Sequence, residues 1–157
     1  MFKRILVCLD GSSTAEEILP YVTDEALAHH SEIILLFVVS LPEITIPISI
    51  PGEPGMPMYT EGAMQRTRNE EIKADEYLKR IAEPMRDKGL DVQCVVLPGV
   101  AGETITNYAQ DNDCKLIAMA THGHGGVRRL VLGSTADFVL HHSSVPMLIV
   151  RPGNKQA

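Results

Sequence analysis

The chain has few cysteines, no long apolar run and no excess of basic residues, and each of these features excludes a class of protein. Its three cysteines, Cys8, Cys94 and Cys114, are odd in number and lack C-x-x-C spacing. This pattern argues against a disulfide framework and fits small buried side chains in a reducing compartment. The apolar run 5–9 is too short for a signal-peptide core, and no run approaches the length of a membrane span. We therefore expect a cytoplasmic protein without a membrane partner.

The charge balance is acidic. Fourteen Lys and Arg residues stand against 20 Asp and Glu residues, which gives a formal net charge of -6. Nucleic-acid binding relies on clustered basic residues, and the one local basic pair is Arg128-Arg129. We therefore expect no nucleic-acid partner. With 45% hydrophobic and 22% charged residues, the composition is typical of a soluble globular protein, and we expect a single domain over residues 1–157.

Five short apolar runs have the length of buried strands. Helical patterns separate them, and strands that alternate with helices form a parallel sheet with helices on both faces. The pattern therefore predicts an α/β fold with three layers. The expected strands are 5–9, 33–39, 91–97, 115–119 and 145–150.

The helical segments contain residues that predict where helices begin, bend and end. Ser13 and Glu16 form a capping-box pattern for the first helix, and Pro20 within that helix predicts a kink. Pro84 predicts a bend near the end of the longest helix, and Gly89 predicts its end. The expected helices start at Ser13, at about Glu61 (ending near Lys88), at about Ala101 (ending near Gln110) and at Ser134 (ending near His142).

Residues 41–58 contain five of the ten prolines and two of the twelve glycines. Proline lacks a backbone N–H and interrupts both helices and central strands. We therefore expect a long loop that continues neither a sheet nor a helix. A loop of this length in a compact domain is usually functional or mobile.

The segment 120–134 carries the strongest functional signal. Four glycines fall between Ala120 and Gly133, after the apolar run 115–119 and before a helix that begins at Ser134. Glycine lets the backbone approach a ligand closely, and a helix N-terminus favours negative charge. From residue chemistry alone, the segment is either a phosphate cradle or a flexible connector.

Several known motifs are absent from the chain. No Gly-Lys-Ser/Thr of a Walker A loop occurs, and Arg128 stands where the dinucleotide fingerprint has its third glycine. There is no G-x-S-x-G elbow, and no evident base accompanies Arg128 and Arg129 for phosphoryl transfer. A receiver domain would need an Asp near Leu97, where this chain has none. The adjacent pairs His29-His30 and His141-His142 do not chelate, because neighbouring side chains on a helix point about 100° apart.

Three segments of the chain resemble the universal stress protein family, and the resemblance extends along essentially the whole chain. Nucleotide-binding members of the family carry Gly-x2-Gly-x9-Gly-Ser/Thr, and Gly123-x9-Gly133-Ser134 matches that spacing. Ala120 replaces the first glycine and adds one methyl group where the family brings backbone close to the nucleotide. Residues 5–12 resemble the opening strand and acidic turn, and 143–151 resemble the closing strand.

The resemblance implies a Rossmann-like sheet of five parallel strands in the order 3-2-1-4-5. It implies an adenine nucleotide, ATP or AMP, with Mg²⁺ carried on the phosphates, and a homodimer paired through Val145 to Val150. An exposed edge strand as apolar as 147–150 tends to pair with another chain, which favours this dimer. The implied function is nucleotide-dependent regulation in a stress response, through an unknown protein partner and without catalytic residues. Two alternatives stay open: a dimeric interaction module that binds no nucleotide, and a slow ATPase.

The resemblance also implies which residues form the nucleotide site. Asp10 is suited to accept hydrogen bonds from ribose hydroxyls, and Val38 is expected against the base. The residues expected near the adenine and ribose are Leu9 and Asp10. Those expected on the ribose and phosphate side are Met119, Ala120, His122 and Gly123. Those expected to donate hydrogen bonds to phosphates are Gly133, Ser134 and Thr135.

Overall fold

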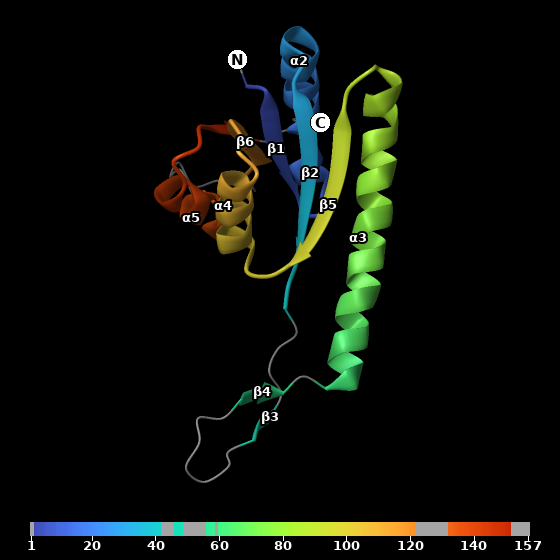
Figure 1. Ribbon diagram of the computed structural model, residues 1–157, viewed down its shortest axis with the longest axis vertical. Helices are drawn as coiled ribbons and strands as arrows, with labels where there is room; N and C mark the ends of the chain where they lie inside the picture. Colours follow the sequence, from blue (N-terminus) through green and yellow to red (C-terminus); the bar gives the residue numbers. More distant parts are fainter. Residues whose placement is uncertain (1, 42–45, 49–55, 59, 122–131, 152–157) are drawn as a thin grey trace, which may run out of the picture.

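A sheet of five parallel strands forms the centre of the protein (Figure 1). The computed structural model describes residues 2–41, 46–48, 56–58, 60–121 and 132–151. The strand order is β5-β2-β1-β6-β7, which is 3-2-1-4-5 among the strands of this sheet, so the expected topology is confirmed. The strands are β1 (Arg4–Leu9), β2 (Glu32–Val39), β5 (Val92–Pro98), β6 (Leu116–Ala120) and β7 (Met147–Val150).

Helices cover both faces of the sheet and complete the three layers (Figure 1). One face carries α1 (Ser13–Glu16), α2 (Leu19–His29) and α3 (Glu61–Asp87), and the other carries α4 (Ala101–Asp111) and α5 (Ser134–His142). Side chains along β1 alternate between two cores: Ile5 and Val7 pack toward α1–α3, and Leu6 and Cys8 pack toward α4 and α5. Such double burial explains why the strands are continuous apolar runs.

The expected first helix is two helices. Ser12 rather than Ser13 is the N-cap of α1, and its Oγ accepts a hydrogen bond from the Ala15 backbone N–H at 3.1 Å. The kink expected at Pro20 is wrong, because α1 ends at Glu16 and Pro20 lies in the first turn of α2. Proline fits this position since the backbone N–H that it lacks would have no helical partner there.

The segment 41–58 contains a short β-hairpin, which corrects the expectation of a loop without strands. β3 (Ile46–Ile48) pairs antiparallel with β4 (Met56–Met58) in a small sheet separate from the central one. Pro47 stands opposite Pro57 at the middle of the pair. Proline is compatible with this register because alternate pairs in an antiparallel ladder exchange no hydrogen bonds.

The long helix α3 agrees closely with the expectation. It begins after the N-cap Thr60, whose Oγ1 accepts a hydrogen bond from the Ala63 backbone N–H at 3.2 Å. Gly89, just beyond its end, has φ +85°, as expected for a helix stop. Its buried residues include Tyr77, which is 8% exposed. In the part of the chain that the structure describes, neither α3 nor any other helix is long and apolar enough to cross a membrane.

Candidate functional site

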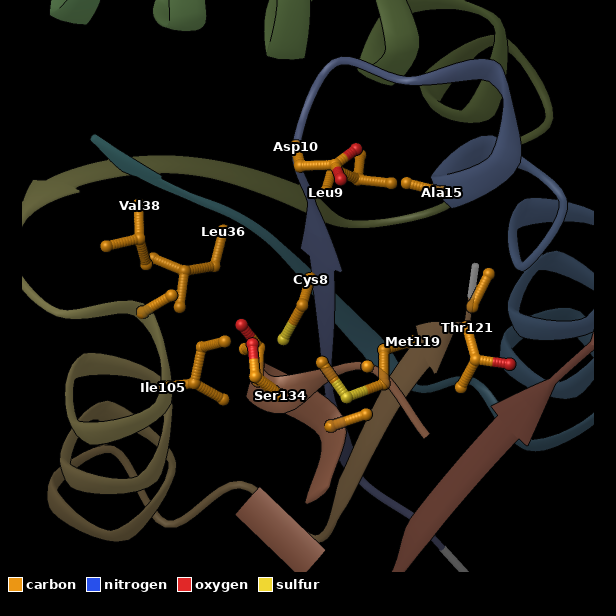
Figure 2. Close-up of a pocket in the computed structure, with 15 residues that line it drawn as sticks. Cys8, Leu9, Asp10, Ala15, Leu36, Val38, Ile105, Met119, Thr121 and Ser134 are labelled. Carbon is orange, nitrogen blue, oxygen red and sulfur yellow. The ribbon is translucent and has the colours of Figure 1, made fainter. Parts of the chain in front are cut away.

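A cavity of about 320 Å³ lies at the carboxyl ends of β1, β2 and β6, on the face that α4 and α5 cover (Figure 2). Its volume falls within the roughly 300–1,000 Å³ typical of small-molecule sites. β1 and β6 are neighbours in the sheet, and the helices that follow them lie on opposite faces. The chain therefore leaves the sheet in two directions at this point, where open α/β sheets bind ligands.

Eight of the ten expected site residues line this cavity. They come from the ends of β1, β2 and β6 and from the start of α5, so the fold brings together four segments that are distant in sequence. His122 and Gly123 lie outside the described residues. The eight are Leu9, Asp10, Val38, Met119, Ala120, Gly133, Ser134 and Thr135.

Seven further residues line the cavity and were not expected from the sequence. Leu36 lies two residues before Val38 on β2, so the period-two alternation of a strand could have identified it. Ala101 and Ile105 carry no comparable signal, because only the packing of α4 on the sheet brings them to the cavity. The seven residues are Cys8, Ala15, Leu36, Ala101, Ile105, Thr121 and Ala136.

Hydrogen bonds give the turn after β1 a defined shape. Asp10 Oδ1 accepts hydrogen bonds from the Ser12 backbone N–H at 2.9 Å and from Ser12 Oγ at 2.6 Å. The same Ser12 Oγ accepts the N-cap hydrogen bond from Ala15 at the start of α1. Gly11 has φ +82°, a conformation that glycine adopts without strain. The turn therefore holds the exposed Asp10 carboxylate at the rim of the cavity.

The start of α5 forms another wall of the cavity. Gly133 is the N-cap of α5, and no described side chain caps this helix. An uncapped helix start offers backbone N–H donors and the positive end of the helix dipole to an anion. Ser134 and Thr135 add hydroxyl groups in the first turn. In Figure 2, Asp10 and Ser134 lie on opposite sides of Cys8, so a carboxylate and a set of donors flank the same space.

The floor of the cavity is apolar. Leu36 and Val38 come from β2 and Ile105 from α4, and the buried thiol of Cys8 lies between them and Met119 (Figure 2). Burial raises the pKa of Cys8 to about 12, so the thiol stays protonated and is a poor nucleophile at neutral pH. The described residues contain no cluster of three or more His, Cys, Asp or Glu that could hold a metal ion. The arrangement suits reversible binding of a ligand with a flat apolar part and an anionic part.

The chain matches a known family along nearly its whole length. The model of the universal stress protein family matches residues 1–151. Universal stress protein MJ0577 of Methanocaldococcus jannaschii is 28% identical over 160 residues, which cover 98% of each chain. The solved structure of MJ0577 aligns with a TM-score of 0.79 at 27% identity and covers 99% of each chain.

Two further solved structures with the same fold hold nucleotides. One is a universal stress protein in complex with cAMP, 16% identical with a TM-score of 0.64 over 97% of this chain and 98% of that chain. The other is the universal stress protein from Archaeoglobus fulgidus in complex with dAMP, 18% identical with a TM-score of 0.61 over 95% of this chain and 97% of that chain. At these identities the likeness is one of fold.

Proposed function

The chain belongs to the universal stress protein family, and from this premise we propose that it binds an adenine nucleotide, ATP or AMP, in the cavity between Asp10 and Ser134. The observation that carries the proposal is the arrangement of groups around the cavity. A carboxylate lies on one side, an apolar floor lies in the middle and an uncapped helix start lies on the other side. These walls match the ribose hydroxyls, the base and the phosphates of a nucleotide. The cAMP and dAMP complexes of two structural neighbours support the choice of adenine.

Each part of the nucleotide has a proposed partner. Val38 packs against the base, and Asp10 accepts hydrogen bonds from the ribose hydroxyls. Ser134 and Thr135 donate hydrogen bonds to phosphate oxygens through their backbone N–H groups and hydroxyls. A Mg²⁺ ion would bind to the phosphates of ATP and would need few ligands from the protein. The remaining proposed contacts are those of Leu9, Met119, Ala120, His122, Gly123 and Gly133.

The proposed activity is regulation by binding. Nucleotide occupancy changes the surface that the protein presents to a partner beside the start of α5. The segment 41–58 is a second candidate for such a change. A homodimer paired through β7, in the cytoplasm, completes the proposal.

Calorimetric titration of the purified protein with ATP, AMP and GTP tests the proposal. We expect binding of the adenine nucleotides, and a loss of about tenfold or more in affinity for Asp10→Ala and for Ser134→Ala, because hydrogen bonds to charged groups are strong. Asp24→Ala is the matched control, since Asp24 is an exposed carboxylate on α2. Absence of both heat and a thermal shift with ATP and AMP would refute nucleotide binding.

Ala120 favours a second candidate function, a dimeric interaction module that binds no nucleotide. Ala120 ends β6 beside the cavity, and its methyl group packs with the core on the α1–α3 face. If this methyl group excludes the phosphates, the wild-type protein shows no binding and Ala120→Gly restores it. If the wild-type protein binds ATP and Ala120→Gly improves affinity only a few-fold, the nucleotide site stands. Phosphate release measured in the same samples tests the slow ATPase.

A further inference from the structure

Asp10 borders a second cavity, on the α3 face of the sheet. This cavity has a volume of about 470 Å³ and shares Asp10 and Val38 with the first one. Its other walls include Gly11, Phe37 and Tyr77. The Asp10 turn therefore has open space on two sides, and the contacts that it makes decide where its carboxylate stands.

Tyr77 of α3 reaches the Asp10 turn by two routes. Its hydroxyl donates a hydrogen bond to Glu16 Oε1 on α1 at 3.0 Å. Its ring also packs edge-on against Phe37, with ring centroids 6.0 Å apart and an angle of 76° between the rings. Phe37 lies directly beneath the turn, since a Cβ on Gly11 would stand 3.6 Å from Phe37 Cε2. Tyr77 thus supports the turn in two ways, through the Phe37 ring and through Glu16 on α1.

Backbone and side-chain hydrogen bonds continue the route from Glu16 to Asp10. The Glu16 backbone N–H donates to the Ser12 carbonyl oxygen at 3.3 Å. Ser12 Oγ then donates to Asp10 Oδ1 at 2.6 Å. Burial and the neighbouring Glu16 raise the pKa of Tyr77, so its hydroxyl remains a donor across the physiological pH range.

We propose that Tyr77 is a positioning residue that holds the Asp10 carboxylate where ribose hydroxyls can reach it, a role that rests on the proposed nucleotide site. Tyr77 touches no part of the first cavity and lies on the opposite face of the sheet. Its contacts connect it to the ligand site through Glu16, Phe37 and the Asp10 turn. Loss of its hydroxyl therefore weakens the contact to the ribose and leaves the contacts to the base and phosphates intact.

The ratio of affinities for ATP and 2′,3′-dideoxy-ATP measures this role. Tyr77→Phe keeps the ring against Phe37 and removes only the hydrogen bond to Glu16. We expect it to lower the ATP preference about three- to tenfold, less than the loss of a whole hydrogen bond to a charged group, because Tyr77 acts on the ribose contact indirectly. Glu16→Gln, which keeps an acceptor, is expected to preserve the preference, and Tyr21→Phe is the control because Tyr21 is 55% exposed. General destabilisation weakens both nucleotides equally, so an unchanged ratio in Tyr77→Phe overturns the proposal.

Amide exchange in the ligand-free protein gives a second test that needs no nucleotide. The Ser12 and Ala15 amides donate hydrogen bonds within the turn and its cap, so their exchange reports its order. We expect faster exchange at both in Tyr77→Phe, with the β1 amides of Ile5–Val7 unchanged. If the wild-type protein binds neither nucleotide, the proposed function fails, and unchanged exchange at Ser12 separately overturns the support by Tyr77.

Discussion

At the scale of single residues, the three cysteines differ in exposure. Cys8 and Cys114 are buried, whereas Cys94 on β5 is partly exposed. Burial raises the pKa of all three thiols, and the Arg86 guanidinium beside Cys94 opposes that rise. Arg4 opposes the rise at Cys114 as Arg86 does at Cys94, so it is exposure that favours reaction at Cys94.

We expect iodoacetamide at pH 8 to modify Cys94 first and to reach Cys8 and Cys114 only after unfolding. The folded pKa of Cys8, about 12, lies above the ordinary value of 9.0. Burial of the neutral thiol therefore makes its full contribution to the free energy of unfolding below about pH 9. That contribution is lost as the pH rises toward 12. Peptide mapping by mass spectrometry, with and without urea, measures the order of labelling. Labelling of Cys8 as fast as Cys94 in the folded protein would contradict it.

At the scale of elements, α4 and α5 meet where glycine allows it. A Cβ on Gly102 of α4 would stand 2.6 Å from Phe138 Cδ1 and 3.0 Å from Phe138 Cβ on α5. Because Phe138 Cβ is bonded to the backbone, it can move away from this contact only if α5 moves. Phe138 also lies one turn after Ser134, so the same contact sets the position of the helix start that lines the cavity.

We expect Gly102→Ala to lower the free energy of unfolding by about 1–3 kcal/mol, the usual cost of overpacking. Gly62→Ala is the matched control, because Gly62 lies in α3 with nothing within 4 Å of its added Cβ. There the better helix propensity of alanine adds up to about 1 kcal/mol. Urea denaturation measures both variants, and a Gly102→Ala protein as stable as the wild type would contradict the close packing.

The two helical prolines have opposite expected effects. Pro84 lies inside α3 on its exposed side, where it removes a helical hydrogen bond. We expect Pro84→Ala to raise the free energy of unfolding by about 1 kcal/mol or more. Pro20 lies in the first turn of α2, so Pro20→Ala should lower it by less than about 1 kcal/mol, through the freer unfolded chain. Thermal unfolding distinguishes the two, and equal shifts of one sign would be inconsistent with these positions.

At the scale of the whole molecule, β7 is an edge strand of the central sheet. The Val150 carbonyl accepts a hydrogen bond from Thr121 at 2.9 Å, so the backbone of Val150 faces β6. Backbone groups of consecutive strand residues point to opposite sides, and those of Ile149 therefore face away from the sheet. A second copy of β7 is the proposed cover for this edge.

We expect Ile149→Lys to convert the proposed dimer to a monomer, because a charge on an edge strand disfavours strand pairing. Leu140→Lys is the control, since Leu140 is 47% exposed on α5. Light scattering of the eluting protein measures the mass. A wild-type monomer, or an Ile149→Lys protein that remains a dimer, would argue against pairing through β7.

The sequence alone determined the α/β layers and most element boundaries. Continuous apolar runs such as 33–39 require cover on both faces, and residues such as Gly89 end helices by local backbone preference. These signals are local, so they can be read along the chain. The strand order and the expected site residues came from the resemblance to a family rather than from spacing.

Only the tertiary structure decided which distant residues meet. It placed Ala101 and Ile105 on the cavity wall, set Tyr77 under the Asp10 turn and paired Pro47 with Pro57 in a hairpin. None of these contacts has a local signature, because each depends on how one element packs against another. The sequence therefore determines which side chains stand at each strand end, whereas the cavity between those ends arises from long-range packing.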